Sequence, residues 1–215
     1  MNNKKKITTL LLAGAVPFNF LVYQGGRFIA RDLPHVDLTS MFDAYIPVLP
    51  WTVFIYWGIA VPFWIINHCL CAYYDKYDSQ RFIISHYIGH AVCFLVFALF
   101  PTTMPRPEIV GSTIFDRLLV LVYQNDSPDN LLPSIHCFSS WLCWIGTRRN
   151  PQIPVWHQLA SCLIAIAICL STLTVKQHVI VDVFAGIMLA ELSYYIAGQC
   201  GRIRLFNGNI GSSNR

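Results

Sequence analysis

The residues that could do chemistry begin with His178 and Asp182. From Ser171 to Asp182 the chain reads Ser-Thr-Leu-Thr-Val-Lys-Gln-His-Val-Ile-Val-Asp, which places an imidazole and a carboxylate in an otherwise apolar part of the sequence. On a helix these two side chains are one turn apart and face the same way. The carboxylate can then hold one ring nitrogen and leave the other free to react, as in an activated nucleophile or base. The alternative interpretation is a buried polar pair that only satisfies itself.

Composition indicates that such a site would belong to a membrane protein. The chain has 215 residues, of which 55% are hydrophobic and 12% charged, and its mean hydropathy is +0.49. This is too apolar for an ordinary soluble domain of that length. The eight cysteines fall in or beside apolar runs, so they indicate neither a disulfide framework nor a zinc site. We expect the bilayer, and not a nucleic acid, as the partner, and the oligomeric state stays open.

Six apolar runs must position these residues, and each has about the 20 residues that a membrane-crossing helix needs. The sequence therefore predicts an all-α fold, a bundle of six transmembrane helices. Residues 1–24 form either the first spanning helix, which we favour, or a signal peptide. Residues 25–200 are expected to form the membrane-embedded domain, and residues 201–215, rich in Gly, Asn and Ser, a disordered cytoplasmic tail. The runs cover about residues 7–23, 51–73, 82–100, 132–147, 155–173 and 178–200.

Charge predicts the orientation of this bundle in a plasma or cytoplasmic membrane. Six crossings with both termini in the cytoplasm put ten of the 15 Lys and Arg residues on the inner side, as the positive-inside rule requires. His178 then lies at the extracytoplasmic face. The outer basic residues include those nearest the expected site, which suggests that they bind an anion. They are Arg27, Arg31, Arg106, Arg117 and Lys176.

Three segments would meet at the outer face in this topology: Arg106-Pro107, Pro133-Ser134-Ile135-His136, and Ser171 to Asp182. Together they resemble the type 2 phosphatidic acid phosphatase family. The signatures of that family read K-x6-R-P, P-S-x-H and S-R-x5-H-x3-D. The second is complete as Pro133-Ser134-Ile135-His136, and the first keeps Arg106-Pro107 but has Leu99 at the lysine position. The third keeps Ser171, His178 and Asp182 and has Thr172 at the arginine position. The resemblance covers about residues 43–190 and implies the family's phosphatase and haloperoxidase-like helical core.

The resemblance implies a role for each of these residues. His178 would attack phosphorus to give a phosphohistidine, with Asp182 fixing its tautomer. His136 would protonate the leaving oxygen and then activate the acceptor. The expected phosphate-binding residues are Arg106, Ser134, Lys176 and Ser171. Arg106 stands between two prolines and its fork matches phosphate oxygens, although it could instead contact headgroups. Ser134 could simply cap a helix, and either Lys176 or Arg117 could replace the missing cations.

These residues predict an integral membrane phosphatase that hydrolyses a lipid-linked phosphate or pyrophosphate without a cofactor or metal. His68, His86 and His90 invite a metal site, but the sequence offers no convincing set of further ligands. Leu99 and Thr172 make the chain similar to divergent branches that include inositol-phosphorylceramide and sphingomyelin synthases, so a lipid phosphotransferase is the first alternative. A non-catalytic channel or scaffold is the second. A vanadate-dependent haloperoxidase would share the site, but the spanning helices disfavour it.

Overall fold

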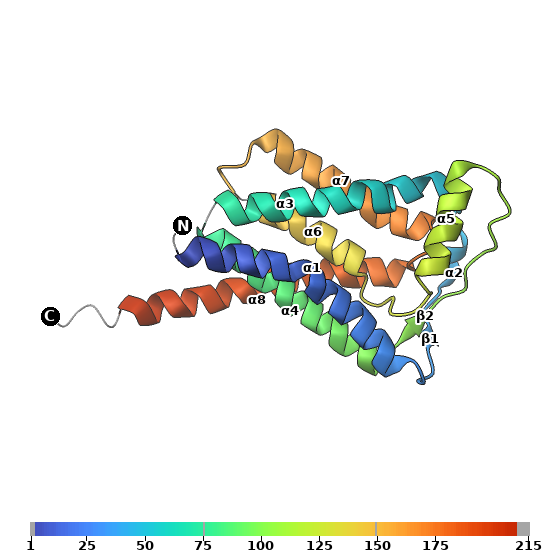
Figure 1. Ribbon diagram of the computed structural model, residues 1–215, viewed down its shortest axis with the longest axis horizontal. Helices are drawn as coiled ribbons and strands as arrows, with labels where there is room; N and C mark the ends of the chain where they lie inside the picture. The colour runs from blue at the N-terminus through green and yellow to red at the C-terminus, as the bar shows by residue number, and fades with distance from the viewer. Residues whose placement is uncertain (1–2, 75, 149, 210–215) are drawn as a thin grey trace.

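Helices make up most of the chain in the computed structural model, which describes residues 3–74, 76–148 and 150–209 (Figure 1). The long helices run along the long axis of the molecule and form a bundle, and the short elements lie at one end of it. The helices are α1 (Asn3–Ala30), α2 (Met41–Ala44), α3 (Ala60–Tyr74), α4 (Lys76–Leu99), α5 (Ile114–Asn125), α6 (Ile135–Arg148), α7 (Val155–Thr174) and α8 (Ile180–Asn209). A 3₁₀ turn, η1 (Pro50–Thr52), and a π-helical turn, η2 (Phe54–Ile59), lead into α3.

Four helical segments of the described chain are long and apolar enough to cross a membrane. They are Pro50–Cys71, Ser79–Leu99, Val155–Thr174 and Ile180–Gln199, and they match the second, third, fifth and sixth apolar runs. Large apolar side chains on these segments point outward, among them Leu163 and Phe184. Outward apolar side chains are what a bilayer solvates. The chain therefore has the helices of a membrane protein, while the full six-span arrangement stays a prediction.

The fourth run forms a shorter helix than the sequence indicates. Helix α6 has 14 residues, a length of about 21 Å against a hydrocarbon core of about 30 Å. The expected start at residue 132 is wrong, because the preceding backbone is fixed in a non-helical path. The amides of Leu131 and Leu132 both donate to the hydroxyl of Thr102, at 3.1 and 3.0 Å. Pro133 consequently precedes the helix and does not lie in its first turn.

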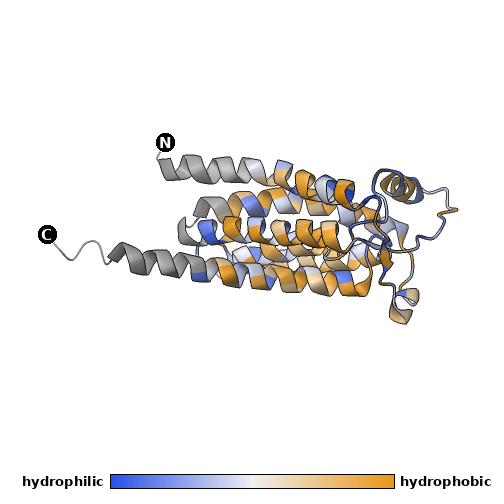
Figure 2. Ribbon diagram, turned by 90° about the horizontal axis from the view of Figure 1, so that it is seen from below, coloured by the Kyte–Doolittle hydropathy of each residue, from blue (hydrophilic) through white to orange (hydrophobic). Residues whose placement is uncertain are grey.

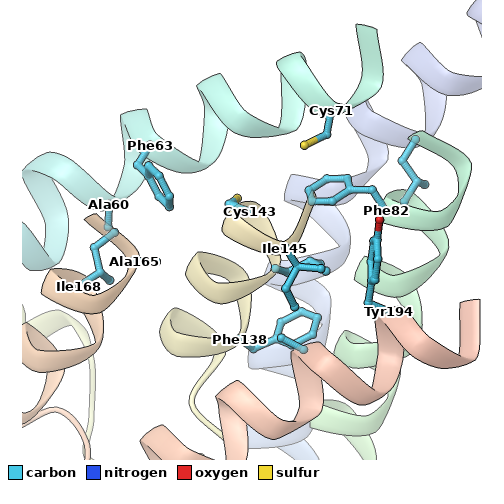
Figure 3. Close-up of a cluster of buried hydrophobic side chains, with 13 residues drawn as sticks. Ala60, Phe63, Cys71, Phe82, Phe138, Cys143, Ile145, Ala165, Ile168 and Tyr194 are labelled. Carbon is cyan, nitrogen blue, oxygen red and sulfur yellow. The ribbon is translucent and has the colours of Figure 1, made fainter. Parts of the chain in front are cut away.

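Helix α6 is the centre of the bundle, with α3, α4, α7 and α8 packed around it. Phe138, Leu142 and Ile145 on α6 are fully buried. Figure 3 shows Phe138 and Ile145 among side chains from α3, α4, α7 and α8, including Phe82 and Tyr194. A helix enclosed by other helices can be short and still stable, because protein and not lipid surrounds the backbone polar groups at its ends.

Glycine allows α8 to approach the start of α6 closely. A Cβ atom on Gly186 would lie 2.6 Å from the carbonyl oxygen of Ser134 and 3.1 Å from the amide nitrogen of Phe138. The amide of Ser134 also donates to the carbonyl of Asp182, at 3.1 Å. The two chain segments that carry the second and third signatures are therefore in direct backbone contact.

The end of the bundle near α5 holds the connections that precede α3, flank α5 and join α7 to α8, and the opposite end holds the start of α1 and the end of α8 (Figure 1). Figure 2 shows apolar residues along the long helices and hydrophilic ones in these connections. Two short parallel strands, β1 (Val36–Asp37) and β2 (Thr102–Thr103), pair here, and neither was predicted. The expected disorder from residue 201 is wrong as far as Asn209, because α8 continues to that residue with no proline to end it. Residues 210–215 lie outside the described chain.

Candidate active site

His178 lies in a tight turn between α7 and α8 that the end of α7 holds in place. The amides of Gln177 and His178 both donate to the carbonyl of Thr172, at 3.0 and 3.2 Å. Lys176 has φ = 52°, a left-handed conformation that reverses the chain after a helix. The turn of residues 175–179 therefore presents His178 immediately before α8 and outside the four candidate spans.

The carboxylate of Asp182 orients the His178 ring and caps α8 at the same time. One oxygen, Oδ2, lies 3.3 Å from Nδ1 of His178 and accepts the amide of Val179 at 3.0 Å. Reaching back from the third helical residue is the usual way for an acidic side chain to cap a helix. Both side chains are buried, with His178 7% exposed and Asp182 0%. Because Nδ1 faces the carboxylate, Nε2 is the ring nitrogen left for reaction.

The exchange Asp182→Asn is expected to cost more stability in acid than in alkali. Burial lowers the pKa of the His178 imidazole, but the hydrogen bond and the charge of Asp182 outweigh burial and raise it above its ordinary value. A raised pKa in the folded state stabilises the fold fully below the unfolded pKa, about 6.5, and this contribution is lost as the pH rises through the folded value. The difference in unfolding midpoint between wild type and variant should therefore be larger at about pH 5.5 than at about pH 8.5.

A matched control for this exchange is Asp37→Asn, which removes an exposed carboxylate that accepts the nearby amide of Thr39. Thermal unfolding in detergent across the pH range measures both variants. A loss in Asp182→Asn that is the same at every pH would show that the carboxylate caps α8 without interacting with a protonated His178 ring.

His136 lies in the first turn of α6 and comes close to His178. The centroids of the two imidazole rings are 6.3 Å apart. His136 also stacks on Tyr56, with centroids 4.3 Å apart and ring planes inclined by 19°, and touches the edge of Trp64. Tyr56 comes from the π-helical turn η2, an irregularity often found at functional sites. The imidazoles of the second and third signatures therefore lie near each other.

Arg106 reaches the same turn from the segment after β2. Its guanidinium donates to the carbonyl of Asp126 and to the side-chain oxygen of Gln177, the residue before His178. It also lies over the ring of Tyr123, with 4.8 Å from Cζ to the centroid. Burial lowers the pKa of Arg106, yet a guanidinium keeps its charge in proteins. The three segments singled out in the sequence therefore meet at the α5 end of the bundle.

Three further predicted residues lie at the same end, with their polar atoms already bonded to protein. The hydroxyl of Ser134 accepts the amide of Cys137 at 3.3 Å, as a helix cap does. The hydroxyl of Ser171 donates to the carbonyl of Ile168 at 2.7 Å. The ammonium of Lys176 donates to the carbonyl of Asp43 at 2.9 Å.

Asp43 is a residue that the sequence did not single out. Its carboxylate accepts the amide of Ile180 at 2.7 Å and the amide of Ser40 at 2.8 Å. Together with the hydrogen bond from Lys176 to the carbonyl of Asp43, these contacts join α2 to the turn that carries His178 and to the start of α8. The only sequence signal is the Ser-x-x-Asp spacing of a capping box at residues 40–43, which says nothing of a contact so far along the chain.

The positions where the signatures would have cations hold neutral side chains in different surroundings. Leu99 ends α4 and is 78% exposed. Thr172 is fully buried, and its hydroxyl donates to the carbonyl of Cys169 at 2.7 Å. Arg117 is exposed on α5. Within the described chain, Arg106 is therefore the guanidinium that bonds to a side chain of the His178 turn, that of Gln177.

The histidines of the possible metal site form a separate cluster between α3 and α4. Nε2 of His68 lies 3.3 Å from Nδ1 of His86, and the rings of His86 and His90 have centroids 4.1 Å apart. Within the described residues, no group of three or more His, Cys, Asp or Glu side chains is arranged to hold a metal ion.

The chain was compared with protein families, curated proteins and solved structures. No family model, no curated protein and no solved structure matches it. Any functional conclusion therefore rests on the residues and the geometry of this site.

Proposed function

We propose that this protein is an integral membrane phosphatase that hydrolyses a lipid-linked phosphate or pyrophosphate through a phosphohistidine. The observation that carries the proposal is the approach of His178, held by Asp182, to His136 at 6.3 Å between ring centroids. Arg106 is attached to the residue next to His178. Two imidazoles beside a guanidinium form a set that can attack phosphorus, protonate a leaving group and bind oxyanions.

The reaction would proceed in two steps with His178 as the nucleophile. Nε2 of His178 attacks phosphorus, and the N–P bond forms as the P–O bond to the lipid breaks. His136 gives a proton to the departing lipid oxygen. Water then attacks the phosphohistidine and gives a proton to His136, the N–P bond breaks, and inorganic phosphate leaves. The guanidinium of Arg106 stabilises the charge on the phosphoryl oxygens in both steps.

The position of the site supports a lipid substrate at the extracytoplasmic face. The turn of residues 175–179 contacts α5 at one end of the bundle, where Tyr123 donates to the carbonyl of Val175 at 2.9 Å. A substrate with its chain in the bilayer could bring its phosphate to such an end by lateral diffusion. The excess of Lys and Arg in the segments assigned to the opposite side favours the outer leaflet.

Release of phosphate by the purified protein in detergent tests this proposal. The substrates are phosphatidic acid, phosphatidylglycerol phosphate and polyprenyl pyrophosphate, each with and without a metal chelator. We expect release from at least one of them, undiminished by the chelator and retained in the control His35→Ala, whose ring lies outside the site and contacts the carbonyl of Leu33. Folded protein that releases no phosphate from any of these and forms no phosphohistidine would contradict the proposal.

Transfer of the phosphoryl group to a lipid or sugar hydroxyl is the second candidate. It is favoured by Thr172, a neutral residue at the position of the signature arginine. The position that resembles the arginine of a lipid phosphatase holds a buried hydroxyl bonded within its own helix. Fewer cations around the phosphoryl group are also a feature of the phosphotransferase branches that the sequence resembles. Strict dependence of turnover on an added alcohol acceptor would identify transfer, whereas free phosphate in acceptor-free assays would identify hydrolysis.

A further inference from the structure

Gln177 occupies a position that the proposed mechanism has not used. It precedes His178 in the turn of residues 175–179 and is 2% exposed. Its side-chain oxygen, Oε1, accepts a hydrogen bond from Nη2 of Arg106. A guanidinium has only donors, so the oxygen and not the nitrogen of the amide must face Arg106. This contact fixes the orientation of the amide and turns the NH₂ group away from Arg106.

The NH₂ group of Gln177 is a buried donor without an acceptor. Within the described chain, neither Nε2 of Gln177 nor Nε of Arg106 has a hydrogen-bond partner, and both atoms are buried. The great majority of buried donors in proteins have an acceptor, and an exception calls for an explanation such as a bound ion. Two such donors on side chains that contact each other would be satisfied by one ligand rich in acceptors.

We propose that Gln177 is a phosphate-binding residue whose NH₂ group donates to a phosphoryl oxygen of the substrate beside Nε of Arg106. The identification of the ligand as a phosphoryl group rests on the proposed function. Gln177 would thereby supply a neutral donor in a site where Thr172 stands at the position of a cation. It would hold Arg106 with one end of its amide and the substrate with the other.

Binding of inorganic phosphate and orthovanadate to the purified full-length protein tests this inference without requiring turnover. The variant Gln177→Glu keeps an oxygen for Arg106 and replaces the donor with a second oxygen, at almost unchanged volume. Gln177→Leu removes both polar ends. The matched control is Gln124→Glu, which introduces the same charge at an exposed position of α5. Affinity is read from the rise in unfolding midpoint with anion concentration, and phosphate release from the preferred lipid is measured in parallel.

We expect Gln177→Glu and Gln177→Leu to weaken anion binding by roughly ten- to a hundredfold, because the loss of one hydrogen bond to a charged group changes affinity by about that factor. Gln124→Glu should bind anions like wild type. Wild-type affinity in both Gln177 variants, with phosphate release intact, would overturn the inference and leave the proposed function standing. If Gln177→Leu does not fold, Gln177→Glu decides, because it retains the contact with Arg106. A wild-type protein that neither binds these anions nor releases phosphate would overturn both.

Discussion

Replacing His178 with alanine is expected to lower phosphate release from the lipid substrate by at least about 10³-fold, to the background of the assay. The ring is the nucleophile in the proposed mechanism, and no other described imidazole is both held by a carboxylate and within reach of His136. The measurement is the rate of phosphate release by purified protein in detergent, with the unfolding midpoint of each variant recorded alongside.

The loss must be separated from a loss of the fold. His178 contacts the carboxylate that caps α8, so its removal is expected to lower the unfolding midpoint. His178→Asn keeps a polar group near Asp182 and should be equally inactive while folding better. His35→Ala is the matched control with full activity. A folded His178 variant that turns over like wild type would exclude His178 as the nucleophile and contradict the proposed mechanism.

Replacing His136 with alanine is expected to slow turnover of the lipid substrate by about 10² to 10⁴-fold, the usual contribution of a general acid and base. The loss should be much smaller for the first step of a substrate such as p-nitrophenyl phosphate, whose leaving group departs without a proton. Rapid-mixing measurements of the first turnover with both substrates give the comparison. An equal loss with the two substrates would exclude His136 as the proton donor.

The stacking of His136 on Tyr56 provides a second control. His136→Phe keeps an aromatic ring on Tyr56 but has no proton to give, so it should be as slow as His136→Ala. Recovery of activity in His136→Phe would mean that the histidine only fills space between η2 and α6. Tyr56 is fully buried, and the variant Tyr56→Phe should retain both its fold and its activity if stacking alone is needed.

Hydrophobic run length predicted the helices of this fold better than their ends. The run near residues 155–173 coincides with α7 (Val155–Thr174), because a mostly apolar stretch without proline or Asp, Glu, Lys and Arg lies between two turn segments. The start of α6 was misplaced, because a distant hydroxyl, that of Thr102, holds the backbone before it. A contact between residues about 30 positions apart leaves no periodic signal in the sequence.

The spacing of His178 and Asp182 predicted their contact, although the two residues do not lie on one helix as the prediction assumed. The two side chains meet as they would on a helix, yet His178 precedes α8 and lies in a turn where Lys176 has a left-handed backbone. The carboxylate therefore both orients the ring and starts the helix. The meeting of Arg106 with this turn was expected only from topology and from resemblance. Its attachment through Gln177 depends on two side-chain orientations, which sequence alone does not specify.

Contacts from outside the three signatures were not predictable. Asp43 reaches Ile180 across more than 130 positions, and Tyr56 reaches His136 from a π-helical turn. Both depend on how the connections fold over the end of the bundle. The residues with the clearest sequence pattern carry the proposed chemistry, while those without a pattern hold them in place.

The most direct measurement is to locate the phosphate on the protein. Purified protein is quenched in alkali, where phosphohistidine survives, within the first turnover of a ³²P-labelled lipid phosphate, and the labelled peptide is sequenced by mass spectrometry. We expect one phosphate on residue 178, absent in His178→Asn and longer-lived in His136→Ala. If the wild type and His136→Ala turn over the substrate without becoming labelled, or if the label lies on another residue, His178 is not the nucleophile.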